Sequence, residues 1–109
     1  MSIKAVAWGE KLETEDSILY TLQATVRGKR ELNRLTEEAV EWTTAGKGYD
    51  PRTEKTIVLL KRKFENKKSW IKFAKSLSFP VEELNSRTGE GKIINGKRKT
   101  KRSQYERVT

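Results

Sequence analysis

The chain has 109 residues, about a third of them apolar and slightly more charged, and its formal net charge is +9. It contains no cysteine and no histidine, which excludes disulfides, thiolate metal sites and the usual general base near neutral pH. No apolar run approaches the roughly 20 residues that span a bilayer, and the N-terminus lacks the apolar segment of a signal peptide, so we expect an intracellular protein.

The first half of the chain predicts two strands and a helix. Residues 3–8, "IKAVAW", form a short apolar run that ends at a glycine and is typical of a strand. Residues 18–26 give the clearest alternation in the chain and predict a second strand, which an acidic loop joins to the first as an antiparallel hairpin; one phase of the alternation consists of Ile18, Tyr20, Leu22, Ala24 and Val26. Residues 29–48 change to helical spacing and end at glycines, with one apolar stripe made of Leu32, Leu35, Ala39 and Trp42.

The second half predicts a third strand, a second helix and a tail. Asp50-Pro51 indicates a turn, and residues 56–64 form an apolar, β-branched strand that becomes basic. Residues 66–77 are amphipathic, with Asn66 or Ser69 as the cap of a helix. Pro80 favours a short helix after it, residues 91–96 suggest a hairpin arm, and we expect disorder beyond Lys97.

Together these elements predict an α+β fold in the order β-β-α-β-α. A small antiparallel sheet of about three strands would pack against two main helices. We expect one domain at residues 1–88 and a basic, largely disordered tail at residues 89–109.

The basic excess lies entirely in the second half. Residues 1–55 carry nine Lys/Arg and ten Asp/Glu, whereas residues 56–109 carry fifteen Lys/Arg and five Asp/Glu. A polyanion such as nucleic acid would therefore meet the second half first.

Two basic clusters predict phosphate contacts. The first lies on the third strand and second helix and consists of Lys61, Arg62, Lys63, Lys67, Lys68, Lys72 and Lys75. The aromatic side chains Phe64, Trp70 and Phe73 are interleaved with it, and their faces either stack on unpaired bases or form the core stripe of the helix. The second cluster is a flexible arm with Lys92, Lys97, Arg98, Lys99, Lys101 and Arg102.

Two stretches resemble known site patterns. Residues 69–92 resemble a helix-turn-helix followed by a basic hairpin, although Glu82 and Glu83 stand where base contacts would lie. Asp50 with Glu65 and Lys67 resembles the acid and Glu-x-Lys pattern of restriction-endonuclease-like nucleases, which implies two carboxylates around Mg²⁺ with Glu38 as a further acid.

The interpretation that the sequence favours is non-catalytic binding of DNA or RNA through the two basic clusters, without a cofactor or a metal. Two alternatives stay open. One is the metal-dependent nuclease that the Glu-x-Lys resemblance implies. The other is a small basic protein that binds and modulates an acidic protein partner.

Overall fold

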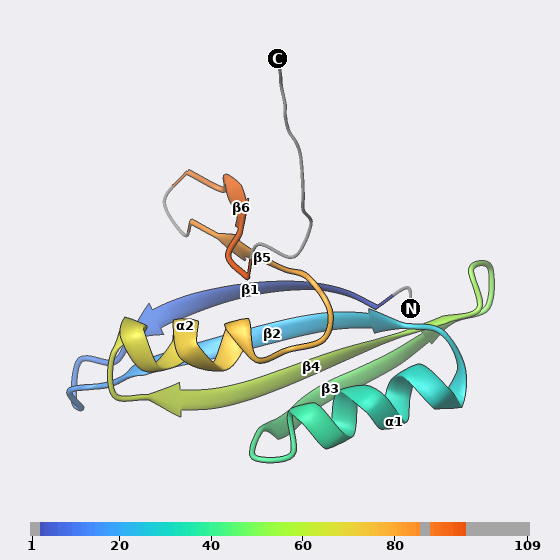
Figure 1. Cartoon of the computed structure of the whole chain (residues 1–109), viewed down its shortest axis with the longest axis horizontal. Helices are drawn as coiled ribbons and strands as arrows, with labels where there is room; N and C mark the ends of the chain where they lie inside the picture. Colours follow the sequence, from blue (N-terminus) through green and yellow to red (C-terminus); the bar gives the residue numbers. More distant parts are fainter. Residues whose placement is uncertain (1–2, 86–87, 96–109) are drawn as a thin grey trace.

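The computed structural model describes residues 3–85 and 88–95, in which six strands form one mixed sheet and two helices lie over one of its faces (Figure 1). The elements follow the chain as β1 (Lys4–Lys11), β2 (Ile18–Val26), α1 (Gly28–Glu38), β3 (Thr43–Asp50), β4 (Lys55–Phe64), α2 (Lys67–Lys75), β5 (Val81–Leu84) and β6 (Gly91–Ile93). The strand order in the sheet is β3-β4-β2-β1-β5-β6, and only the β1–β5 pair is parallel among these described strands.

The predicted three-stranded antiparallel sheet in the order β-β-α-β-α is wrong, because β3, β5 and β6 also join the sheet. β3 has the sequence "TTAGKGYD", whose two glycines and exposed side chains give little strand signal. It is an edge strand that pairs with β4 around a register shift between Thr44 and Gly46. Pairing with β4, rather than local propensity, makes this segment a strand.

The predicted short helix after Pro80 is also wrong. Residues 81–84 form β5, which pairs in parallel with β1 at Ala5, Val6 and Ala7. The two strands are about 75 residues apart in sequence, and no local pattern of four residues reveals such a partner.

The helix predicted over residues 29–48 is α1, but it ends at Glu38. The chain turns after Ala39, where the Trp42 N–H donates to the Ala39 carbonyl at 3.0 Å. Trp42 and Leu35 are nevertheless both buried, as the apolar stripe predicted. Helical spacing therefore identified Leu35, Ala39 and Trp42 as buried without showing that Ala39 and Trp42 lie beyond the helix, and Leu32 is only partly buried.

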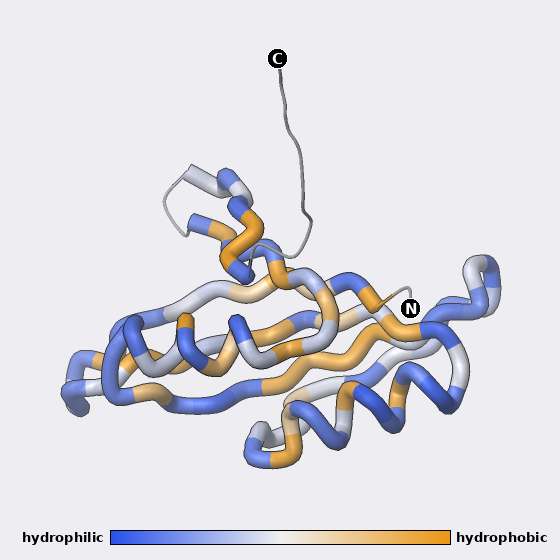
Figure 2. The backbone as a smooth tube through the Cα atoms, viewed as in Figure 1, coloured by the Kyte–Doolittle hydropathy of each residue, from blue (hydrophilic) through white to orange (hydrophobic). Residues whose placement is uncertain are grey.

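Several local predictions are confirmed. β1 and β2 form an antiparallel hairpin, and the core-facing residues of β2 are the alternating set that was predicted, including Tyr20, Leu22 and Ala24. Asn66 caps α2, because its Oδ1 accepts a hydrogen bond from the Ser69 N–H at 2.9 Å. β4 changes along its length from an apolar half to a hydrophilic half (Figure 2).

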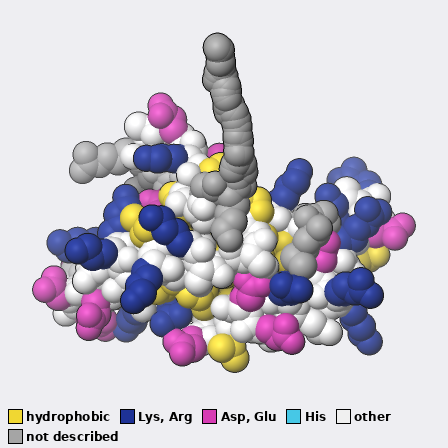
Figure 3. All heavy atoms as spheres, in the orientation of Figure 1, with side chains coloured by type: hydrophobic (Ala, Val, Ile, Leu, Met, Phe, Trp, Pro, Cys, Tyr) yellow, Lys and Arg dark blue, Asp and Glu magenta, His cyan; other side chains and the backbone are white. Residues whose placement is uncertain are grey.

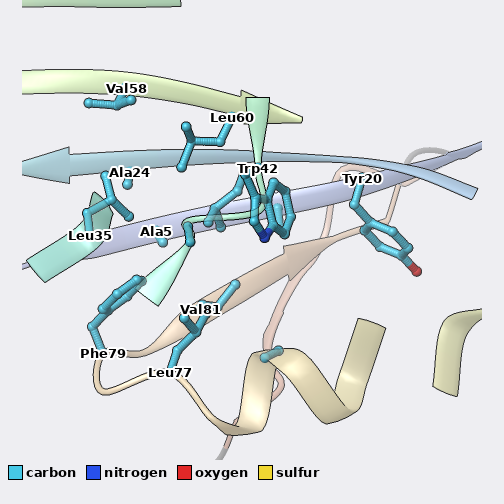
Figure 4. Packing of buried hydrophobic residues seen from close by; sticks show 14 of the residues in the cluster. Ala5, Tyr20, Ala24, Leu35, Trp42, Val58, Leu60, Leu77, Phe79 and Val81 are labelled. Atoms are coloured by element: carbon cyan, nitrogen blue, oxygen red, sulfur yellow. The ribbon is translucent and has the colours of Figure 1, made fainter. Parts of the chain in front are cut away.

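The core lies between the sheet and the two helices. Its buried side chains come from one face of the strands, from α1 and α2, and from the segments that follow each helix (Figure 4). Trp70, Ala74, Leu22 and Val81 are almost fully buried there. None of the helices in the described part of the chain is long and apolar enough to cross a membrane.

Asn95 fastens the end of the described chain to the core, beyond the predicted domain boundary at residue 88. Its side-chain amide donates to the carbonyl of Phe79 at 2.7 Å, and its Oδ1 accepts from the N–H of Val81 at 3.4 Å. The Ile94 N–H also donates to the Val81 carbonyl at 3.1 Å. These bonds hold residues 94–95 against the connection between α2 and β5, while residues 96–109 lie outside the described part of the chain.

Asn95→Ala should lower the free energy of unfolding by about 1–3 kcal/mol, because buried backbone groups at Phe79 and Val81 lose their partner. Urea denaturation followed by circular dichroism measures this. The matched control is Asn33→Ala on the exposed side of α1, which should change stability by about 0.5 kcal/mol or less. Equal effects of the two substitutions would contradict the structural role of Asn95.

Candidate nucleic-acid interface

The sheet divides the first predicted basic cluster between two faces. Side chains alternate along β4, and Val58, Leu60 and Phe64 point into the core. Lys61 and Lys63 therefore lie on the opposite, open face of the sheet, where both are exposed. The lysines of α2 lie on the helix-covered side, so these residues do not make one continuous surface.

Arg62 is occupied by contacts within the protein. Its guanidinium lies 4.7 Å from the centre of the Phe64 ring and 5.6 Å from that of Phe73. One of its nitrogens is 2.8 Å from a carboxylate oxygen of Glu41. Stacking and ion pairing of this kind hold the side chain at the rim of the core, which leaves it less able to reach a phosphate than a free lysine.

Three lysines of α2 form an exposed stripe without a described counter-charge. Lys68, Lys72 and Lys75 are spaced by four and three residues, so they lie on one side of the helix, which contains no acidic residue. We call them the α2 lysine stripe. All three are exposed, and no ion pair involves them within residues 3–85 and 88–95. Like charges at this spacing destabilise a helix by roughly 0.2–0.5 kcal/mol per pair.

The other face of α2 is fixed by Trp70. Its indole is fully buried and stacks on Tyr20, with ring centres 4.5 Å apart and planes 18° apart. Its Nε1–H donates to the Glu83 carboxylate on β5 at 2.7 Å. Because Trp70 is joined to two strands, α2 cannot rotate about its axis, and the lysine stripe must point away from the sheet.

The aromatic residues interleaved with the basic cluster are core residues. Phe64 and Trp70 are buried, and Phe73 is half-buried against Trp42 and the Arg62 guanidinium. The core-stripe reading of their spacing is therefore the correct one, and Phe64 and Trp70 have no free ring face for a base.

The environment of Trp70 also affects the ionisation of Tyr20. Burial of the phenol, together with the nearby negative charge of Glu83, raises the pKa of Tyr20 to about 12. At the sheet's outer end, hydrogen bonds from Lys63 and Ser17 and the charge of Lys63 lower the pKa of the Glu15 carboxyl. Lys63 thus has an acidic partner at 2.9 Å, although both groups are exposed and the pair is weak.

Lys67 and Lys92 share a different environment. The Lys67 ammonium lies 3.4 Å from a carboxylate oxygen of Glu83, which is mostly buried. Both lysines line a hollow of about 290 Å³ between the start of α2 and the β5–β6 hairpin. Lys67 is therefore partly neutralised, whereas Lys92 is exposed on β6.

Neither of the two resemblances to known site patterns fits the geometry. The second helix of the helix-turn-helix is strand β5 in the structure. For the nuclease pattern, Asp50 pairs with Lys55 at one end of β4 and Glu65 follows its other end, about 30 Å away at the usual rise per residue. The Glu38 carboxylate on α1 accepts a hydrogen bond from the Ser78 N–H and forms an ion pair with Arg34 of the same helix. Among the described residues there is no cluster of acidic side chains able to bind a metal.

In the described part of the chain, basic side chains outside the α2 lysine stripe do not form a single surface (Figure 3). Lys and Arg side chains gather at both ends of the elongated molecule on the face shown in Figure 3, with acidic side chains among them. The second cluster, apart from Lys92, falls at residues 97–102, outside the described part of the chain.

Sequence reasoning missed the open face of the sheet. Its side chains are the second phase of the alternation in β1 and β2, among them Val6, Trp8, Leu19 and Thr21. The sequence shows that these residues alternate with the core residues. It does not show that both helices pack on the other side of the sheet and leave this face without a helix over it.

Comparison of the chain with protein-family models, with curated proteins and with solved structures finds no match.

The stability of the protein should fall between pH 10 and about pH 12. In this window Tyr20 loses its proton in the unfolded chain, near its ordinary pKa of 10, but keeps it in the folded protein. The unfolded state then binds fewer protons, so rising pH favours unfolding, and the stabilisation present below pH 10 is lost.

Urea midpoints measured across this range for the wild type and Tyr20→Phe test the assignment. The variant should lose the part of the pH dependence that Tyr20 causes, whereas Tyr49→Phe, at an exposed tyrosine, should keep it. Identical pH profiles for wild type and Tyr20→Phe would show that this phenol is not responsible.

Proposed function

We propose that the protein binds nucleic acid without catalysis and that the α2 lysine stripe is its main ordered contact with the phosphate backbone. The observation that carries the proposal is the stripe itself, three exposed lysines on a helix without an acid. A polyanion repeats negative charge along its length and fits such a row, whereas a single small anion would need a converging pocket.

One residue of the stripe lies where a cation does not help the helix to fold, whereas Lys72 and Lys75 lie in the last turn, where the helix dipole favours cations. Lys68 is in the first turn of α2, where the helix dipole disfavours a cation, and the first turn contains no acid. Lys67 in the same turn has Glu83 as a partner, but Lys68 has no described ion pair. The position of Lys68 therefore costs helix stability, and an external negative charge would relieve that cost.

The second basic cluster extends the same proposal. The chain continues from Asn95, which is held at the end of α2 and the start of β5, into Lys97, Arg98, Lys99, Lys101 and Arg102. Because Asn95 lies beside the helix that carries the lysine stripe, the cations that follow it in the sequence can add phosphate contacts to those of the stripe.

Replacing the α2 lysine stripe by glutamine should weaken binding and reduce its salt dependence. Each neutralised phosphate contributes about 0.9 to the slope of log K against log salt on duplex DNA, so the triple variant Lys68→Gln, Lys72→Gln, Lys75→Gln should make the slope shallower by about 2–3. Anisotropy titrations of a labelled duplex at several salt concentrations measure it.

The control triple Lys29→Gln, Arg30→Gln, Lys47→Gln removes the same charge from α1 and β3. It should change the slope much less, because these side chains lie away from α2. Equal changes in both triples would mean that only net charge matters, and no change in the α2 triple would remove the stripe from the interface.

A second experiment repeats the titration with a truncated chain that ends after Gly96. If the truncated chain loses the salt dependence and the α2 triple variant keeps it, the phosphate contacts lie in the second cluster. Absence of binding to any oligonucleotide would contradict the proposal and favour the acidic protein partner instead.

A further inference from the structure

The open face of the sheet presents a row of side chains suited to an unpaired base. In cross-strand register, Trp8 of β1 lies beside Thr21 of β2, and Thr21 lies beside Lys61 of β4. The neighbouring row contains Val6, Gln23 and Leu59. These residues alternate with core residues such as Ala5, Ala7 and Leu22, so they face away from both helices, although Thr21 is itself buried with only 6% of its surface exposed.

Trp8 differs from the other two tryptophans in its exposure. Trp42 and Trp70 are buried in the core, whereas Trp8 is half-buried on a face that neither helix covers. Trp8 thus has indole surface available to a ligand. An aromatic ring on a sheet surface is a sequence-tolerant platform on which a base stacks.

The surroundings of Trp8 supply the other groups that a nucleotide needs. Lys61 and Lys4 are exposed on this face, and neither is in a described ion pair. A hollow of about 360 Å³ opens on the same face, and its lining includes Lys4, Val6, Gln23, Thr25, Glu82 and Ile93. The Gln23 amide and the Thr25 hydroxyl both donate and accept hydrogen bonds, as base edges require.

The composition of the face favours nucleic acid over a second protein surface. Ile57 and Ile93 are 39% and 46% exposed, so the face has an apolar part. Its middle rows, however, present the exposed Lys61 and the half-buried Gln23, and lysine is depleted from the centre of protein interfaces. A cation beside an aromatic ring is the combination that single-stranded nucleic acid uses, since phosphates and bases are both accessible in it.

We propose that the open face binds single-stranded nucleic acid, with a base stacked on Trp8, phosphates at Lys61 and Lys4, and a neighbouring base at the hollow beside Gln23. This goes beyond the phosphate contacts of the α2 lysine stripe, which lies on the other side of the sheet and does not distinguish single from double strands. Bases in a duplex are already stacked, so the open face selects unpaired strands.

The test compares an oligothymidylate of about ten nucleotides, within the usual site size for such surfaces, with a duplex of the same length. Trp8→Ala should weaken binding to the single strand by about 5- to 150-fold, the equivalent of one stacked base, and leave duplex binding unchanged. Trp8→Phe should retain most of the affinity, and Lys61→Gln should make the salt slope on the single strand shallower by about 0.7.

Tyr49→Ala is the matched control, because Tyr49 is an exposed aromatic residue on the edge strand β3 and should not affect binding. Tryptophan fluorescence gives a second readout that does not depend on the stability of the alanine variant. The single strand should quench the wild type but not Trp8→Phe, in which Trp42 and Trp70 are the remaining tryptophans.

Three results would overturn the proposal. They are unchanged single-strand affinity in Trp8→Ala, equal loss on duplex and single strand, and quenching that persists in Trp8→Phe. Sedimentation showing a dimer that Trp8→Ala or Trp8→Phe dissociates would assign the face to a second copy of the chain instead. Because the duplex titration depends on the α2 lysine stripe, failure of the open face and failure of the stripe give different patterns.

Discussion

The burial of Trp70 is the constraint on which the arrangement of this protein depends. One side chain joins three elements, because it belongs to α2, stacks on Tyr20 of β2 and donates to Glu83 of β5. Around it, Phe64 of β4 and Trp42 after α1 make edge-to-face contacts at 5.8 and 6.1 Å between ring centres. Aromatic contacts of this kind each contribute about 0.5–1.5 kcal/mol beyond area burial and fix the angle at which a helix lies on a sheet.

This constraint gives the two sides of the sheet different chemistry. The helix that Trp70 holds turns Lys68, Lys72 and Lys75 outward, so the covered side presents cations on a rigid helix. Both helices lie on that side, which leaves Trp8 and Lys61 on a face made only of strands. The proposed contacts with phosphates and with bases thus follow from the same one-sided packing, and they are separable by mutation because the sheet lies between them.

The sequence predicted the features that a clear local pattern signals and missed the strands that depend on pairing with a partner. The alternation of β2, the cap at Asn66 and the amphipathic spacing of α2 are local, and the structure confirms them. β5 exists because the distant strand β1 offers it hydrogen bonds, and β3, which pairs with the next strand β4, was missed because its own glycine-rich segment has weak strand propensity. The sequence also did not show that the basic cluster is split, since Lys61 and Lys68 look contiguous in it and only the strand alternation together with the helix position separates them.

The most direct test of the proposed contacts is an NMR titration of the ¹⁵N-labelled protein with duplex and single-stranded oligonucleotides, followed through the amide and indole N–H signals. Both ligands should shift the amides around Lys68, Lys72 and Lys75, and only the single strand should shift the indole signal of Trp8. The signals of the buried Trp42 and Trp70 should change little with either ligand. Titrations in which neither ligand moves the amides of α2 would contradict the central claim that its lysine stripe contacts nucleic acid.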